Sequence, residues 1–170
     1  KGRCMGKPEG SLKILMVTSE AAPFAKAGGL GDAVSSLAME LSRMGHDVRL
    51  FLPRYYFIDV TKEKLSRMPS PLGVPVGTRE VWTGIYEGRL SRSDVPVYFL
   101  DHEASYGRDG IYGTRSEPFF ADNAARFALF SRAAFQLCRH LGWIPDVMHS
   151  HDWPSALCNV YLKTLERNTD

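Results

Sequence analysis

The chain has 170 residues, of which 44% are hydrophobic and 24% charged, and its formal net charge is +2. This composition excludes an intrinsically disordered protein, and so small a charge argues against a nucleic-acid-binding surface. The apolar runs are too short for a membrane span, which needs about 20 residues. Three scattered cysteines without a C-x-x-C pair argue against a disulfide scaffold or a thiolate zinc site and favour a cytosolic-type redox setting.

The first part of the sequence predicts a disordered leader followed by a βαβ unit. Residues 1–10 are rich in Gly, Lys and Pro, which is typical of a leader without fixed structure. The apolar run at 13–18 predicts a strand that is buried on both faces, and segment 47–52 predicts the next strand, which Pro53 ends. Between them, apolar residues recur at every third or fourth position of segment 34–44, which predicts an amphipathic helix.

The rest of the sequence alternates between strand and helix signals. The expected elements are strands at 74–87 and 95–100 with a hairpin turn between them, a glycine-rich loop at 108–118, a helix at 120–141, a strand at 146–150, and a helix at 153–166 capped by Asp152. This alternation predicts an α/β fold: a Rossmann-like, doubly wound, mainly parallel sheet with an inserted antiparallel hairpin. The length by itself predicts one domain, at 11–170.

The segment Lys26-Ala27-Gly28-Gly29-Leu30-Gly31-Asp32 carries the strongest functional signal. It follows the first strand, and ligands of α/β sheets bind at the carboxyl ends of strands. Glycines there let backbone N–H groups approach an anion, and the N-terminus of the next helix adds positive charge. Lys26 can contact a phosphate oxygen, while Asp32 can cap the helix or accept a hydrogen bond from a hydroxyl. A tight turn without a ligand is the alternative interpretation.

Two common nucleotide-binding motifs do not fit this segment. In a P-loop the lysine follows the last glycine, whereas Lys26 precedes the glycines. The dinucleotide fingerprint requires an acidic residue at the end of the second strand, where this chain has Leu52-Pro53-Arg54. The sequence therefore disfavours NAD.

Several segments, in order, resemble the N-terminal signature of bacterial glycogen synthases and plant starch synthases, over about residues 13–160. They are Ser19-Glu20-Ala21-Ala22-Pro23-Phe24 with the glycine segment, Leu52-Pro53-Arg54-Tyr55, Asp122-Asn123 with Arg126-Phe127, Pro145-Asp146-Val147, and His149-Ser150-His151-Asp152-Trp153. The resemblance implies a retaining glucosyltransferase with two Rossmann-type domains (GT-B), which extends an α-1,4-glucan from ADP-glucose and needs no metal or other cofactor.

The resemblance also implies that the chain is the N-terminal half of such an enzyme. The domain would then be incomplete at its C-terminal end and inactive without the C-terminal domain, and neither nucleic acid nor a membrane would be its partner. The expected location is the cytoplasm of a bacterium, or the plastid in a plant. Two alternatives stay open: another GT-B glycosyltransferase that uses UDP-glucose, and a non-catalytic module that binds sugar or nucleotide.

Matched position by position, the resemblance implies roles for seven residues. Lys26 would bind the donor diphosphate, Gly28 and Gly29 would lie against its distal phosphate, Asp32 and Asp152 would be the catalytic groups near the sugar, and Tyr112 and His151 would line the cleft. Ala27 stands where the family usually has threonine. Pro154 stands where a histidine often follows His-Asp-Trp, which leaves any role of that histidine unfilled.

The remaining candidates have plainer interpretations. His149 and His151 form an H-x-H pattern that could chelate zinc, but Trp153 and Pro154 occupy the positions where a metallo-hydrolase needs Asp and His. A core histidine bonded to the backbone is the favoured interpretation of His149, whereas His151 either lines the cleft or supports the loop.

Helix 120–141 raises two further choices. Asp122 and Asn123 are either surface residues or part of a glucan-binding rim. The helical spacing of the phenylalanines favours core packing over a sugar-stacking platform; these residues are Phe119, Phe120, Phe127 and Phe130. Trp153, beside Asp152, is evenly balanced between the two roles.

Overall fold

A computed structural model of the chain describes residues 10–166, so the expected leader, apart from Gly10, lies outside the described residues, as does Cys4. The elements in chain order are β1 (Lys13–Val17), α1 (Leu30–Arg43), β2 (Asp47–Pro53), β3 (Ser66–Arg67), β4 (Leu72–Val76), β5 (Arg79–Arg89), β6 (Pro96–Asp101), α2 (Glu103–Tyr106), α3 (Asn123–His140), β7 (Val147–Ser150), the 3-10 turn η1 (Trp153–Ser155) and α4 (Leu157–Thr164).

The strands form one mixed sheet in the order β3-β5-β6-β2-β1-β7, with β4 paired to β5. β6, β2, β1 and β7 run parallel to one another. β5 is antiparallel to β3, β4 and β6. The predicted α/β fold, with a mainly parallel sheet and an inserted antiparallel hairpin, is therefore confirmed.

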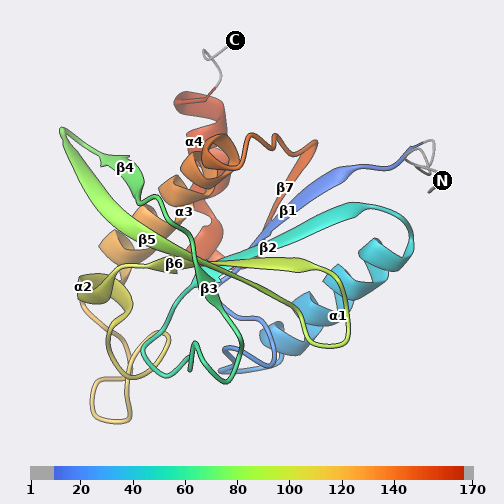
Figure 1. Cartoon of the computed structure of the whole chain (residues 1–170). Helices are drawn as coiled ribbons and strands as arrows, with labels where there is room; N and C mark the ends of the chain where they lie inside the picture. Colours follow the sequence, from blue (N-terminus) through green and yellow to red (C-terminus); the bar gives the residue numbers. More distant parts are fainter. Residues whose placement is uncertain (1–9, 167–170) are drawn as a thin grey trace.

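The direction in which the chain crosses the sheet reverses at β1. From β1 the chain passes through α1 to β2 on one side, and from β6 it passes through α3 to β7 on the other side of β1. Right-handed crossovers then require the two helices to cover opposite faces of the sheet, as Figure 1 shows for α1 and α3. The carboxyl ends of β1 and β7 thus flank the topological switch point, where α/β sheets bind ligands.

The core lies on both faces of β1, β2 and β6, which explains why their sequences are mainly apolar. On one face, the ring of Phe51 in β2 stacks on Phe130 of α3 at a centroid distance of 5.0 Å. Elsewhere in the same core, Phe24 meets Phe99 of β6 edge to face, also at 5.0 Å. Sheet and helices are therefore fixed to each other by aromatic packing close to the switch point.

Two expected elements are divided in the structure. The strand expected at 74–87 is a hairpin of β4 and β5, because Gly77, at φ +60°, supplies the left-handed backbone of a two-residue turn. The helix expected at 153–166 consists of η1 and α4, and Asp152 caps η1 by accepting the amide of Trp153 at 2.7 Å. The Ser155 hydroxyl bonds back to the His151 carbonyl at 2.8 Å, which holds the tighter first turn.

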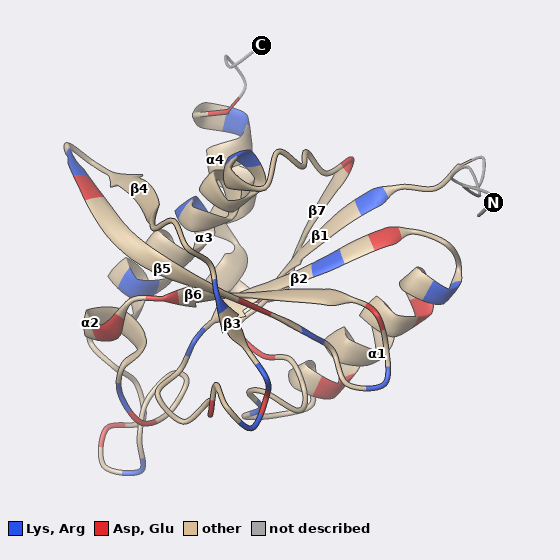
Figure 2. Cartoon of the chain, viewed as in Figure 1, with Lys and Arg blue, Asp and Glu red and all other residues tan. Residues whose placement is uncertain are grey.

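Within residues 10–166, no helix has the length and apolar character required to cross a membrane. Acidic and basic residues are interspersed along the elements in the view of Figure 2 rather than gathered by sign. Cys138 and Cys158 are buried free thiols.

Candidate functional site

The glycine segment lies between the end of β1 and the first turn of α1. Gly29 is the N-cap of α1, and no side chain caps the helix there. The first amides of a helix have no intrahelical partner, so this end is suited to an anion. A Cβ at Gly28 or Gly29 would meet no atom within 4 Å, and neither glycine has a positive φ. Neither the backbone nor the packing of this chain requires glycine there, which favours close approach of a ligand over a simple tight turn.

Lys26 and Asp32 face each other across the loop. Lys26 Nζ lies 2.5 Å from Asp32 Oδ2, and both side chains are about half exposed. The expectation that Asp32 might cap the helix is wrong, because the cap is three residues earlier and Asp32 lies within the first turn. Its charge still stabilises the positive end of α1. The pair presents a half-exposed ammonium group beside the N-terminus of α1.

Glu20 is a site residue that sequence reasoning did not single out. It follows β1, its side chain is only 3% exposed, and its carboxylate accepts three hydrogen bonds. Oε2 accepts the amides of Ala27 at 2.7 Å and Gly28 at 3.1 Å, while Oε1 accepts the phenol of Tyr112 at 2.8 Å. A buried carboxylate needs such partners. The acidic residue within Ser19-Glu20-Ala21 was the available signal in the sequence, but its partners are distant in the chain.

Tyr112 brings the 108–113 loop to the glycine segment. Lys26, Ala27 and Tyr112 line one cavity of about 480 Å³, together with Phe57. Burial raises the pKa of the Tyr112 phenol well above its ordinary value. The phenol therefore stays protonated and donates a hydrogen bond to Glu20. The structure thus places Tyr112 beside Lys26 in one cavity, and its role in a ligand cleft stays a prediction.

Side chains in the first turn of α3 hold the Tyr112 loop in place. Asn123 is buried and donates to the Tyr112 carbonyl at 2.8 Å. Arg126 is also buried and donates to the Ile111 carbonyl at 3.0 Å. Asp122 is exposed and forms an ion pair with Arg108 at 2.8 Å. Asn123 is therefore neither a surface residue nor part of a glucan-binding rim, and it supports the site through Tyr112.

Asp152 has a strained backbone. Its φ of +62° and ψ of 179° fall in a region that is almost restricted to glycine. Neighbouring bonds maintain this conformation: the His151 amide donates to the Val17 carbonyl at 2.9 Å, and Asp152 Oδ1 accepts the Trp153 amide at 2.7 Å. Such strain typically occurs at functional positions. It turns the chain sharply at the carboxyl end of β7, beside the loop that follows β1.

Trp153 connects this turn to the Tyr112 loop. Its ring lies 5.5 Å from Tyr112 and 5.7 Å from Phe119 between centroids. Trp153 is 42% exposed and Phe119 is 60% exposed, so core packing was the wrong expectation for Phe119. The other three phenylalanines are buried as predicted; they are Phe120, Phe127 and Phe130. The structure thus leaves an exposed aromatic surface next to Asp152.

The two histidines of the H-x-H pattern stack on each other, with ring centroids 4.1 Å apart. His149 is exposed, so the expectation of a core histidine bonded to the backbone is wrong. His151 Nε2 is buried and has no hydrogen-bond partner among the described residues. Burial, and then the neighbouring His149, lower the pKa of His151 to about 4. Within 10–166, no group of three or more His, Cys, Asp and Glu side chains is placed to hold a metal ion.

The lowered pKa of His151 predicts a pH-dependent stability. An unfolded histidine titrates near pH 6.5, so between about pH 6.5 and 4 the unfolded chain binds more protons than the folded one. The stability that the neutral His151 side chain contributes to the folded state is present above pH 6.5 and is lost as the pH falls toward 4. We expect His151→Asn to make the fall in Tm between pH 7 and pH 4.5 less steep, as measured by circular dichroism. His140→Asn is the control, and equal slopes for both variants would contradict the prediction.

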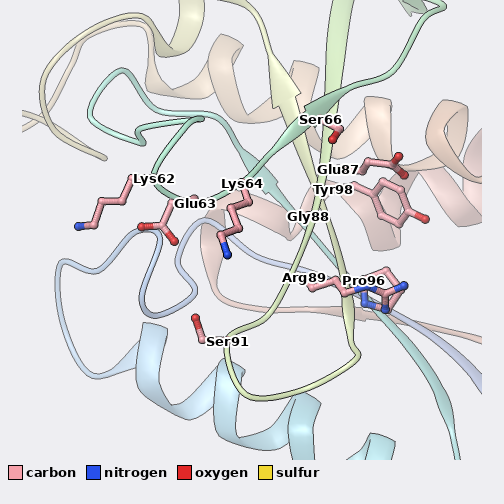
Figure 3. Close-up of a pocket in the computed structure, with 10 residues that line it drawn as sticks. All are labelled: Lys62, Glu63, Lys64, Ser66, Glu87, Gly88, Arg89, Ser91, Pro96 and Tyr98. Atoms are coloured by element: carbon pink, nitrogen blue, oxygen red, sulfur yellow. The ribbon is translucent and has the colours of Figure 1, made fainter.

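A second cavity, of about 640 Å³, lies away from these residues. It is bounded by the segment before β3 and by the β5–β6 hairpin, and Figure 3 shows the basic residues Lys62, Lys64 and Arg89 on its walls. Glu63 and Glu87 also line it. Arg89 already donates to the Asp94 carbonyl at 2.7 Å. This cavity is larger than the one beside Lys26, but it lies away from the switch point and lacks a glycine loop or a helix N-terminus.

A mainly parallel sheet whose strand order reverses between a glycine loop and a strained Asp turn defines a Rossmann-like α/β domain. The sequence pattern of the starch synthase catalytic domain matches residues 13–170. A glycogen synthase of Treponema denticola is 52% identical over 159 residues, which are 94% of this chain and 32% of that protein. Glycogen synthase 1 of Geobacter metallireducens is 48% identical over 154 residues, 90% of this chain and 30% of that protein.

A solved structure shows the same fold. The catalytic domain of starch synthase IV from Arabidopsis thaliana, bound to ADP and acarbose, superposes with a TM-score of 0.76 at 29% identity, covering 91% of this chain and 31% of that one. The chain therefore belongs to the starch synthase catalytic domain family. It spans about a third of the length of these relatives.

Proposed function

We propose that this chain forms the N-terminal half of the active-site cleft of a glycogen or starch synthase. The full-length enzyme would transfer glucose from ADP-glucose to the non-reducing end of an α-1,4-glucan with retention of configuration. The observation that carries the proposal is the glycine loop with Lys26 at the switch point of a sheet that superposes on an ADP-bound starch synthase domain. The bacterial relatives also support a cytoplasmic location.

Charge development in the reaction accounts for the residues at this edge of the sheet. In glucosyl transfer the diphosphate leaves with negative charge while the sugar acquires oxocarbenium character. Lys26 and the N-terminus of α1 supply positive charge for the diphosphate. Asp32 and Asp152 supply negative charge near the anomeric carbon. Gly28 and Gly29 keep the surface of the loop free of side chains, so the distal phosphate can approach the backbone.

The exposed aromatic surface of Trp153 and Phe119 suits a glucan acceptor. Sugar rings pack on aromatic faces through their apolar C–H surfaces, and this surface adjoins both Asp152 and Tyr112. His151, neutral at pH 7 because its pKa is lowered, lies at the same turn as a further cleft residue. The remaining half of the site, including the contacts with the nucleotide base, is assigned to a C-terminal domain outside this chain.

Replacing Lys26 with alanine in the full-length enzyme tests the donor site. We expect kcat/KM for ADP-glucose to fall about 10- to 150-fold, the equivalent of roughly 1.5–3 kcal/mol for a hydrogen bond to a charged group. We expect this fall to come mainly from a higher KM for ADP-glucose, and both constants are measured by incorporation of labelled glucose into glycogen. Lys62→Ala, at an exposed lysine away from the switch point, is the matched control.

The same assay separates the alternatives. Competition between ADP-glucose and UDP-glucose in the wild-type enzyme decides between the two donors, and a preference for UDP-glucose favours the other type of GT-B enzyme. Binding without any glucosyl transfer favours the non-catalytic module. An unchanged donor profile in Lys26→Ala would remove Lys26 from the site.

A further inference from the structure

Glu20 joins two loops that are far apart in the sequence. One carboxylate oxygen accepts the amides of Ala27 and Gly28, and the other accepts the phenol of Tyr112, 92 residues away. Within residues 10–166, no backbone hydrogen bond joins the glycine loop directly to the 108–113 loop. The carboxylate is therefore the polar link between the two walls of the cavity that contains Lys26.

The direction of each hydrogen bond at this link is determined. An ionised carboxylate is an acceptor only, and a phenol has one hydrogen. Tyr112 donates that hydrogen to Glu20, so the Ser19 hydroxyl, 2.7 Å from the same phenol oxygen, must donate to Tyr112. Ser19 thus donates to Tyr112, and Tyr112 donates to Glu20. The amides of Ala27 and Gly28 donate to the same Glu20 carboxylate. Each donor in this network has one defined acceptor.

This arrangement also divides the amides of the glycine loop into two groups, those bound to Glu20 and those left free of it. Those of Ala27 and Gly28 point inward to Glu20, so the amides from Gly29 onward, at the start of α1, are left for an anion. A carboxylate in such a place could hold the loop in shape or compete with the incoming diphosphate. Glu20 is 3% exposed and makes three hydrogen bonds, so displacing it would bury unsatisfied donors. These observations favour the holding role.

We propose that Glu20 is a positioning residue, which fixes the glycine loop and Tyr112 relative to each other so that Lys26 and the first amides of α1 face the donor diphosphate. Glu20 itself contacts neither the donor nor the reacting atoms. This role rests on the proposed nucleotide-sugar site, but the loop geometry it predicts can be measured without any ligand.

The first experiment uses the 170-residue chain and the variant Glu20→Gln, which keeps the shape of the side chain and removes its charge. Hydrogen exchange measured by NMR is expected to become about 10-fold faster at the amides of Ala27 and Gly28, since bonds to a charged acceptor are the stronger ones. Glu80→Gln, at an exposed acid of β5, is the matched control and should change neither rate. Unchanged exchange at both amides in Glu20→Gln would overturn the proposal.

The second experiment uses the full-length enzyme. Glu20→Gln is expected to raise the donor KM about 10-fold while kcat and the acceptor KM change less than twofold, because both loops that Glu20 joins line the cavity that contains Lys26. A general loss of folding would instead lower kcat for all substrates, and a competing role would lower the donor KM; either result contradicts the proposal. If the wild-type enzyme transfers no glucose, the proposed function fails, while the amide exchange still decides whether Glu20 holds the loop.

Discussion

Replacing Asp152 with asparagine is expected to lower kcat of the full-length transferase by roughly 10²–10³-fold, the usual effect of removing one preorganised electrostatic group. Asparagine keeps an oxygen that can accept the Trp153 amide, and it has the same shape as aspartate, so it adds no strain at this backbone conformation. The free energy of unfolding should therefore change by less than about 0.5 kcal/mol. The substitution removes charge from the cleft without disturbing the turn.

Two measurements check this expectation. Steady-state kinetics of glucose transfer give kcat, and urea unfolding of the 170-residue chain gives the stability. Asp94→Asn is the control, because Asp94 is fully exposed in the turn between β5 and β6. Turnover of Asp152→Asn within threefold of the wild type would show that the charge of Asp152 has no part in catalysis, and the strain at this residue would then need another explanation.

Arg126→Met is expected to cost about 3 kcal/mol of unfolding free energy. The guanidinium is 1% exposed and donates to the carbonyls of Ser105 and Ile111 and to the side chain of Asn123. Methionine fills much of the same volume but leaves these buried acceptors without a donor, at about 1–3 kcal/mol each, and part of this is offset because a buried cation is removed. The 105–111 segment should become mobile together with Tyr112.

Urea denaturation followed by tryptophan fluorescence measures this loss. Arg115→Met is the matched control, because Arg115 lies exposed in the loop that follows Tyr112. It should change the stability by less than about 0.5 kcal/mol. A loss below 1 kcal/mol for Arg126→Met would mean that the loop is held mainly by the aromatic rings around Arg126, which are Tyr106, Phe120 and Phe127.

The parallel core of the fold could be predicted because its signals are local. β1 is a nearly continuous apolar run, β2 is mainly apolar, and the spacing of apolar residues in α1 is regular. The hairpin of β4 and β5 was merged into one strand because β-branched and aromatic residues continue on both sides of Gly77, and only its positive φ reveals the turn. The break between η1 and α4 depends on the hydrogen bond from the Ser155 hydroxyl to the His151 carbonyl. No residue pattern in the sequence predicts this bond.

The site could be predicted only where residues are neighbours in the chain. The glycine loop with Lys26 has a local signature, whereas Glu20 obtains its role from Tyr112, which is distant in sequence. The prediction of a core histidine at 149 was wrong because β7 is the last strand of the described sheet and leaves His149 exposed. Phe119 and Phe120 both precede α3, so helical spacing does not set the direction of either ring: Phe120 is buried and Phe119 is exposed.

The link from Glu20 to Tyr112 also has a consequence for the time at which the site is formed during synthesis. Glu20 and the glycine loop are synthesised before Tyr112, whose phenol follows the Glu20 carboxylate by 92 residues. At about 5–20 residues per second, that separation corresponds to a delay of roughly 5–18 seconds. During this interval the carboxylate of Glu20 has no phenol to bind, and any nascent chain that is interrupted before Tyr112 is made carries the loop without its partner.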